Sequence, residues 1–443
     1  MLIPMAFANY AHAAEDVDKI GTADLFVSLF FMPQENRSEA VGQISRNWQP
    51  AHTPMAIEIL SLARGELVSL MVNLLKDKTG EDFGADTNQW FVWWWQQPVS
   101  VDPDYARFKG LLYGHIDEKF KQYFSTEKTP RIRLDEVRWG GVVQDGIPPL
   151  RQPKMISVKE ATYLGDDNVV FGIQINGDAR AYPKRILAWH EMFVDEIGGT
   201  KFAGVYCTLC GAVILYKTEH NGIEHHLGTS GFLYRSNKVM YDLDTQSLWN
   251  TTWGEPVIGA LADKNIRLER SYLVTTTWGE WKRRHPQTSV LSLDTGYRRD
   301  YGEGVAYNQY FATDELMFSI STPDDRLKNK DEILALTLPD QSKDSMAISA
   351  VFLRDKPVYQ NSLGKQNFVV LTDASGANRV FESNDVEFVS YDLDTVAIDS
   401  QGNRWFLQED KLSREGVELT RLPAHRAFWF GWQSAFPETI LIK

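Results

Sequence analysis

The chain has few cysteines, no strongly basic segment and no long apolar run, and each scarcity excludes a class of protein. Two cysteines in 443 residues exclude a disulfide-rich scaffold. The 46 basic residues are outnumbered by 59 acidic ones, and the formal net charge of −13 repels nucleic-acid phosphates and anionic lipid. No run reaches the ~18 to 20 apolar residues of a membrane span. We therefore expect neither a nucleic-acid partner nor an integral membrane span. The expected partner is an unknown small molecule or protein.

Several catalytic motifs are also missing from the sequence. It contains no phosphate loop, no dinucleotide fingerprint, no His-Glu-x-x-His zinc motif and no calcium loop, so those enzyme classes are disfavoured. It also lacks the Gly-x-Ser-x-Gly elbow of many serine hydrolases.

The first residues resemble the late part of a secretory signal. Residues 1–14 are mostly apolar and small, and Ala11-His12-Ala13 has the small-x-small pattern of a cleavage site. The basic start of a signal peptide is missing, so the stretch is either a truncated signal segment or merely an apolar N-terminal segment. The first interpretation predicts a periplasmic or secreted protein, in a compartment that favours disulfides.

The chain is longer than a single hydrophobic core usually allows, and its pattern changes near residue 128. Residues 15–128 show helical spacing of apolar side chains, as in Glu66–Leu75, with Thr79-Gly80 as a stop. A Trp-rich stretch up to Trp95 follows the cap candidate Asp86. This part resembles a unit of a HEAT-like helical array.

Residues 129–443 are dominated by alternating patterns with Gly, Asn and Ser turns. Val169–Ile175 and Ala179–Tyr182 flank an Asn-Gly pair that is typical of a hairpin. Short helices are predicted over residues 183–194, 277–285 and 324–334. The predicted fold class is α+β: a large, mostly antiparallel β domain with short helices, preceded by a small α-helical domain.

A set of short motifs in this second part resembles a bacterial domain of unknown function, family 3179, over about residues 130–440. The motifs are Ala179-Arg-Ala-Tyr-Pro183, Trp189-His-Glu191, Tyr206-Cys-Thr-Leu-Cys-Gly211, Thr229-Ser-Gly-Phe-Leu-Tyr234, Val239-Met-Tyr-Asp242, Ser247-Leu-Trp249, Thr276-Thr-Trp278, His285-Pro286, Asp325-Arg326 and the tail Leu422–Trp432. Members often carry Pro after the first cysteine, where this chain has Thr208. The resemblance implies no activity, so any mechanism has to come from the residues.

Cys207 and Cys210 lie between two apolar segments, which predicts a position in a turn or at strand ends. A Cys-x-x-Cys turn brings two sulfurs close enough to bond to each other or to share a soft cation, copper or zinc. The spacing leaves four interpretations open: a structural disulfide, a metal site, a redox-active dithiol, or buried free thiols.

A metal site would need further ligands. His190 is the best candidate because it precedes the cysteine strand within the Trp-His-Glu motif, although a lone histidine is more often structural. Weaker candidates are His226, Met240 and Asp242; the last two would share one face of a strand. Each of the three also has an ordinary interpretation as a core or surface side chain.

Two residues are weak catalytic candidates. Glu191 could orient an imidazole or act as a general base, but it could equally be an exposed helix carboxylate. Ser230 could act as a nucleophile with His226 as its base.

The leading hypothesis is an exported protein in which Cys207 and Cys210, helped by His190, hold copper or zinc or cycle as a dithiol. The alternative is a non-catalytic binding or structural protein, with a structural disulfide and a helical domain that binds a partner. The sequence does not decide whether the protein is an enzyme.

Overall fold

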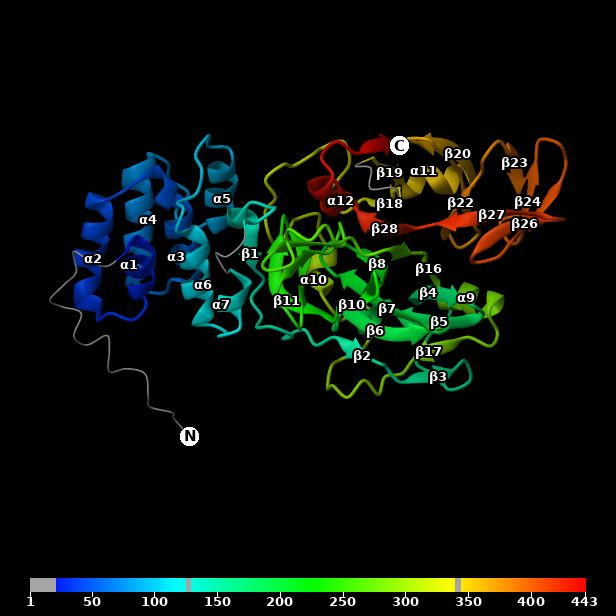
Figure 1. Ribbon diagram of the computed structural model, residues 1–443, viewed down its shortest axis with the longest axis horizontal. Coiled ribbons are helices and arrows are strands. Elements are labelled where there is room, and N and C mark those ends of the chain that lie inside the picture. The colour runs from blue at the N-terminus through cyan, green and yellow to red at the C-terminus, as the bar shows by residue number, and fades with distance from the viewer. Residues whose placement is uncertain (1–20, 125–128, 339–343) are drawn as a thin grey trace. The chain divides into compact units, whose positions relative to one another are not determined.

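The computed structural model describes residues 21–124, 129–338 and 344–443. The chain divides into two compact units, Met1–Glu127 and Lys128–Lys443 (Figure 1). The first contains helices and the second mostly antiparallel strands, so the predicted α+β fold class is confirmed. The signal-like residues 1–14 lie outside the described residues.

The helical unit is built from amphipathic segments. Its helices are α1 (Thr22–Ser28), α2 (Gln34–Arg46), α3 (Thr53–Leu62), α4 (Glu66–Thr79), α5 (Thr87–Trp95), α6 (Tyr105–Gly114) and α7 (Phe120–Tyr123). The predicted signals act as expected: Asp86 caps α5 by accepting from the Gln89 N–H, and Gly80 ends α4 with φ 80°.

A carboxylate is buried at the centre of the helical unit. Glu58 on α3 accepts from Lys109 Nζ at 2.5 Å and from the Tyr105 hydroxyl at 3.0 Å, and its second oxygen accepts from the Tyr113 hydroxyl. The Lys109 ammonium also lies 5.1 Å from the centre of the Tyr113 ring. All four side chains are buried, so the charge of Glu58 is neutralised and hydrogen bonded without water.

The β-rich unit contains six sheets among its described residues, and most neighbouring strands are antiparallel. One sheet has the order β1 (Val137–Trp139), β11 (Leu227–Tyr234), β12 (Asn237–Asp242), β13 (Leu248–Asn250), β14 (Glu255–Ile258). A second has the order β15 (Arg270–Ser271), β8 (Ala212–Lys217), β7 (Thr200–Cys207), β6 (Met192–Ile197), β2 (Leu150–Arg151). A third has the order β16 (Val274–Thr277), β4 (Val169–Ile175), β5 (Asp178–Pro183), β17 (Ser289–Leu291), β3 (Met155–Ser157).

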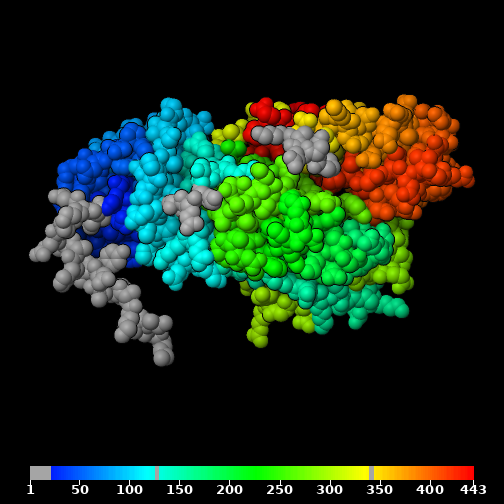
Figure 2. Space-filling view, viewed as in Figure 1, coloured from blue at the N-terminus to red at the C-terminus, as the bar shows by residue number. Residues whose placement is uncertain are grey.

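The remaining sheets are formed largely by the C-terminal part of the chain. A four-stranded sheet has the order β28 (Ala424–Phe428), β18 (Glu332–Thr337), β19 (Ser345–Ser349), β29 (Ile440–Ile442). An eight-stranded sheet has the order β20 (Val358–Leu363), β21 (Gln366–Thr372), β22 (Asn378–Glu382), β27 (Val417–Leu422), β26 (Lys411–Arg414), β25 (Arg404–Leu407), β24 (Val396–Asp399), β23 (Phe388–Tyr391). The strands β9 (Glu219–His220) and β10 (Ile223–Glu224) form a small ribbon. Figure 2 shows the C-terminal segments, in orange and red, packed directly against the green surface of earlier strands.

The helices of this unit are short: α8 (Lys184–Leu187), α9 (Trp278–Arg284), α10 (Asn308–Phe311), α11 (Ala350–Asp355) and α12 (Trp429–Ala435). The helix predicted over 277–285 is confirmed. The one predicted over 183–194 is wrong beyond Leu187, because residues from Met192 on pair with β7 as strand β6. The helix predicted over 324–334 is also wrong, since Glu332 begins strand β18, which pairs with β19 and β28. In both places strand pairing overrides the local helical pattern.

In the described parts of the chain, no helix combines the length and apolar character needed to cross a membrane.

Candidate functional site

The two cysteines form a disulfide in the turn that joins β7 to β8. Cys207 is the last residue of β7 and pairs with Ala212, the first residue of β8, so the predicted position at strand ends is confirmed. The Cα atoms of Cys207 and Cys210 are 5.2 Å apart. Both side chains are buried, with 5% and 1% of their surface exposed.

Distant segments hold the cysteine turn in place. The Phe428 N–H donates to the Cys210 carbonyl at 2.7 Å, and the Tyr310 hydroxyl donates to the Leu209 carbonyl at 2.9 Å. Gly431 on α12 packs so closely that a Cβ there would lie 2.9 Å from the Cys210 Cβ. The turn is therefore fixed by tertiary contacts as well as by its hairpin.

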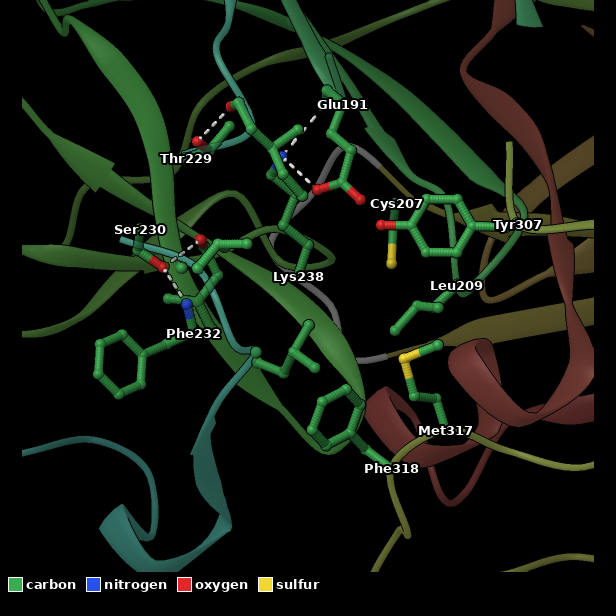
Figure 3. A pocket seen from close by; sticks show the side chains of 16 residues that line it. Glu191, Cys207, Leu209, Thr229, Ser230, Phe232, Lys238, Tyr307, Met317 and Phe318 are labelled. Atoms are coloured by element: carbon green, nitrogen blue, oxygen red, sulfur yellow. Dashed lines mark hydrogen bonds and ion pairs between the residues drawn. The ribbon is translucent and has the colours of Figure 1, made fainter. Parts of the chain in front are cut away.

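A cavity of about 60 Å³ lies against Cys207, and we call it the disulfide cavity (Figure 3). That volume admits about four water molecules. Met317, a lining residue with 48% of its surface exposed, places solvent at the rim. The lining residues are Gly140, Val142, Ile147, Glu191, Cys207, Leu209, Thr229, Ser230, Gly231, Phe232, Leu233, Lys238, Val239, Tyr307, Met317 and Phe318.

A buried ion pair forms part of the cavity wall. Lys238 Nζ donates to Glu191 Oε2 at 3.0 Å and approaches the Glu191 carbonyl oxygen at 3.4 Å, as the dashed lines in Figure 3 mark. The side chains of Lys238 and Glu191 are 4% and 12% exposed. Burial lowers the pKa of Lys238, against the opposing effect of the Glu191 carboxylate. The pair therefore places a cation and a base on the wall of the cavity that Cys207 also lines.

Two residues of the wall have strained backbones. Glu191 has φ 55° and Tyr307 has φ 57°, in the left-handed region that side chains other than Gly, Asn and Asp rarely adopt. Such conformations cost about 1 to 3 kcal/mol each and cluster at functional sites. Glu191 and Tyr307 line the same cavity although 116 positions separate them in the chain.

Other polar groups near the cysteines are poorly matched. Burial, and secondarily the Glu191 charge, raises the pKa of the Tyr307 phenol. The Tyr206 hydroxyl and the Thr208 Oγ1 are buried and have no hydrogen-bond partner among the described residues.

His190 lies next to Glu191 in the chain but is not among the residues that line the disulfide cavity. Its Nδ1 lies 2.9 Å from the Pro148 carbonyl, which can only accept, so Nδ1 carries the proton. Its Nε2 then accepts from the Tyr301 hydroxyl at 2.6 Å. Burial lowers the pKa of His190 and keeps the ring neutral, and both nitrogens are engaged.

The weaker candidate ligands occupy separate places. Met240 packs in an apolar cluster with Trp249. Asp242 accepts from the Thr245 N–H at 2.8 Å and lies 3.5 Å from Nδ1 of the buried His225. His226 is half exposed and pairs with Asp244 at 2.8 Å.

The donor set as folded does not fit copper or zinc. The two sulfurs are bonded to each other, and the nitrogens of His190 are hydrogen bonded elsewhere. Within residues 21–124, 129–338 and 344–443, no group of three or more His, Cys, Asp or Glu side chains could hold a metal ion.

Both catalytic candidates line the disulfide cavity. Ser230 is fully buried; its hydroxyl donates to the Val239 carbonyl at 2.6 Å and accepts from the Phe232 N–H at 3.0 Å. These bonds bridge an irregularity between β11 and β12, and His226, its proposed base, is paired with Asp244. Glu191 lies in the bend before β6, where its carboxylate faces the cavity (Figure 3).

Sequence reasoning missed Lys238 and Tyr307. Lys238 had a signal, because it alternates with Met240 and Asp242 along one predicted strand face, and a cation on a buried face needs an acid. Tyr307 had no signal, since it lies in a loop-rich stretch without periodicity.

A family model described as "Protein of unknown function (DUF3179)" matches residues 144–439. No curated protein matches the chain. No solved structure matches it either.

Proposed function

The chain belongs to the DUF3179 family, whose name carries no activity, and we propose that its β-rich unit is a thiol–disulfide redox module centred on Cys207 and Cys210. One observation carries the proposal: the disulfide borders a cavity that also holds the buried Glu191–Lys238 pair. Perturbed ionisable groups beside a reactive side chain are typical of functional sites.

The Cys207–Cys210 disulfide contributes little to stability, which favours a chemical role over a structural one. It closes a loop with a sequence separation of only 3. By chain entropy, so short a loop contributes about 2 kcal/mol, against about 3 kcal/mol for a loop of about 15 residues. The ladder of β7 and β8 already holds Cys207 beside Ala212 without the bridge.

The two sulfurs have different access, which suggests different roles. Cys207 lines the cavity, whereas Cys210 does not. A small thiolate entering the cavity would attack Cys207 Sγ, form a mixed disulfide and release Cys210 as a thiolate. A second small-molecule thiol would then attack the small-molecule sulfur of the mixed disulfide. This step releases a disulfide of the two small molecules and leaves Cys207 reduced. Two thiols are oxidised and the protein disulfide is reduced to two thiols, so protons and electrons balance.

The ion pair would assist both steps. The Lys238 ammonium stabilises a thiolate on Cys207 because an adjacent cation lowers a thiol pKa. The Glu191 carboxylate is the base in the cavity that can take a proton from the incoming thiol.

Two further proposals accompany the redox module. The signal-like residues 1–14 support export to the periplasm or secretion, where a disulfide would be the resting form. Copper or zinc binding remains a proposal for the reduced protein only, since reduction would free the two soft sulfur ligands. Metal analysis of reduced protein, compared with Cys207→Ser, tests it: equal metal contents would reject it.

The redox proposal is tested by trapping. The Cys210→Ser variant, treated with 2-hydroxyethyl disulfide, should form a stable mixed disulfide at Cys207, detected by mass spectrometry. The matched Cys207→Ser variant should react at least about tenfold more slowly, because Cys210 is 1% exposed and lies outside the cavity.

The alternative, a structural disulfide beside a partner-binding helical unit, predicts a different pattern. Neither variant would then react in the folded state, both would lose stability, and excess dithiothreitol would reduce the wild-type bridge only after unfolding. That set of results would reject the redox proposal.

A further inference from the structure

A second and much larger cavity, of about 760 Å³, lies elsewhere in the β-rich unit. Ligand pockets typically measure roughly 300 to 1,000 Å³. Its wall combines residues of β8, β15, β22 and β27, and we call it the arginine cavity.

The charge of this wall is opposite to that of the chain. Four lining side chains carry a full positive charge and two are acids, in a protein with a net charge of −13. Two of the cations are neutralised nearby: Lys217 pairs with Glu269 at 2.6 Å, and Arg267 pairs with Glu255 at 2.6 Å. Arg270 and Arg421 remain.

Arg270 has no carboxylate partner among the described residues. Its guanidinium donates to Thr337 Oγ1 at 2.6 Å and to the Thr252 carbonyl, both uncharged acceptors. An arginine with only neutral partners keeps most of its attraction for an anion.

Arg421 is buried, at 5% exposure, and only partly neutralised. Its Nη1 donates to the Glu409 carbonyl at 3.0 Å and lies 3.3 Å from Glu409 Oε2, and its Nη2 donates to the Leu273 carbonyl at 3.4 Å. The Glu409 carboxylate makes shorter contacts, of 2.7 and 3.0 Å, with Arg379. The Arg421 Nε is buried and has no hydrogen-bond partner among the described residues. Burial lowers the pKa of Arg421 to about 10, so it stays charged near neutral pH. Arg421 therefore adds positive charge to the cavity wall, while its buried Nε lies out of reach of a ligand.

The cavity also offers surfaces for a ring and for hydroxyl groups. Trp253, Tyr272 and Phe436 line it and are only partly buried. Tyr272 lies beside Arg421, whose Cζ is 5.6 Å from the ring centre. Asn176 and Glu382 supply acceptors of the kind that bind hydroxyl groups.

We propose that the arginine cavity binds an acidic sugar, whose carboxylate is held by Arg270 and Arg421. Its pyranose ring packs against Trp253 and Tyr272, and its hydroxyls bond to the polar side chains of the wall. The carboxylate supplies the negative charge that the two guanidiniums attract, and the cavity volume falls in the range of small-molecule pockets. This site is independent of the disulfide cavity, with which it shares no lining residue.

Calorimetry on the full-length chain with digalacturonate tests the proposal, with maltose as the neutral comparison and inorganic phosphate as the bare anion. Digalacturonate should bind at least about tenfold more tightly than either, because the site requires both a charge and a ring.

Arg270→Gln should weaken digalacturonate binding by about tenfold to a hundredfold, the effect of losing a charge-assisted hydrogen bond. Arg404→Gln, on an exposed residue of β25 outside the cavity, is the matched control and should bind as the wild type does. Tyr272→Ala removes the ring and keeps both arginines, and it should weaken binding about fivefold. If Arg270→Gln does not fold, Arg270→Lys replaces it with the same expected direction, since lysine lacks the planar fork.

Three results would overturn the proposal: no binding of digalacturonate, equal binding of maltose, or unchanged affinity in the Arg270 variant. Equal affinity for phosphate would also overturn it, since the cavity would then recognise an anion without a sugar.

Discussion

The two units each bury a lysine against a glutamate, and they treat the pair in opposite ways. In the helical unit, the carboxylate of Glu58 receives Lys109 and two tyrosine hydroxyls. In the β-rich unit, Lys238 meets Glu191 on the wall of a cavity, and Glu191 has a strained backbone. The first pair is held by tyrosine hydroxyls in the helical core, whereas the second lines a cavity that Cys207 also lines. Under the redox proposal, position beside the cavity, and not burial alone, distinguishes the Glu191–Lys238 pair.

The largest effect is expected from Lys109→Met. It leaves Glu58 as a buried carboxylate without a cation, and loss of one partner of a buried pair costs about 3 to 5 kcal/mol. Urea unfolding followed by circular dichroism measures the free energy of unfolding. A loss below about 1 kcal/mol would mean that the two tyrosine hydroxyls are enough to stabilise the buried Glu58 carboxylate. The contrast between the two buried Lys–Glu pairs would then no longer hold.

Lys238→Met should cost less stability, about 1 to 3 kcal/mol, because Glu191 borders a cavity that water can enter. It should also slow reduction of the Cys207–Cys210 bridge by 2-mercaptoethanol by about tenfold, since the thiolate loses its neighbouring cation. Lys238→Arg keeps the charge and serves as the control. An unchanged reduction rate in Lys238→Met would show that the Glu191–Lys238 pair, like the Glu58–Lys109 pair, has only a structural role.

His425 sharpens the comparison, because it is a buried base that forms no ion pair with an acid among the described residues. Burial, and secondarily the Arg270 charge, lowers its pKa to about 3. Between about pH 6.5 and about pH 3, His425 is therefore protonated in the unfolded state but neutral in the folded state. The free energy of unfolding should fall by up to about 1.4 kcal/mol for each pH unit below about 6.5.

Unfolding free energies of wild type and His425→Gln, measured from about pH 7 to about pH 5, test this sign. The wild type should lose stability more steeply on acidification than the variant. Parallel curves would show that His425 takes up its proton in the folded state as easily as in the unfolded one.

The smallest effect is expected from Lys76→Met, which breaks an exposed pair with Asp82 in the helical unit. Exposed ion pairs are screened by solvent and contribute little, so the free energy of unfolding should stay within the error of the wild-type measurement. A loss as large as that of Lys109→Met would mean that burial is not what separates these pairs.

Local patterns predicted the fold class and the position of the cysteines. The apolar segments on either side of Cys207 and Cys210 are neighbours in the chain, and their pairing as β7 and β8 follows from short-range alternation. The candidate site depended on longer-range contacts. The partners of His190, Pro148 and Tyr301, lie 42 and 111 positions away, so no spacing rule could show that both ring nitrogens are engaged.

The helix predicted over 183–194 fails for a different reason. The segment has helical spacing up to Leu187, but Met192 pairs with Val205 across a tight hairpin, so strand pairing overrides the helical pattern there. This matters for Glu191, which the helix would have exposed and which the bend instead turns toward Lys238.

The hydrogen bond from the Phe428 N–H to the Cys210 carbonyl has a consequence for biosynthesis. More than 200 positions separate the cysteine turn from the segment that covers it, so a nascent chain exposes both thiols until Gly431 has left the ribosome. Oxidation can therefore precede burial, and the order of synthesis lets the bond form before its surroundings close. A shortened chain that ends before Phe428 would keep both cysteines yet lack the Phe428 N–H and the Gly431 backbone that contact Cys210.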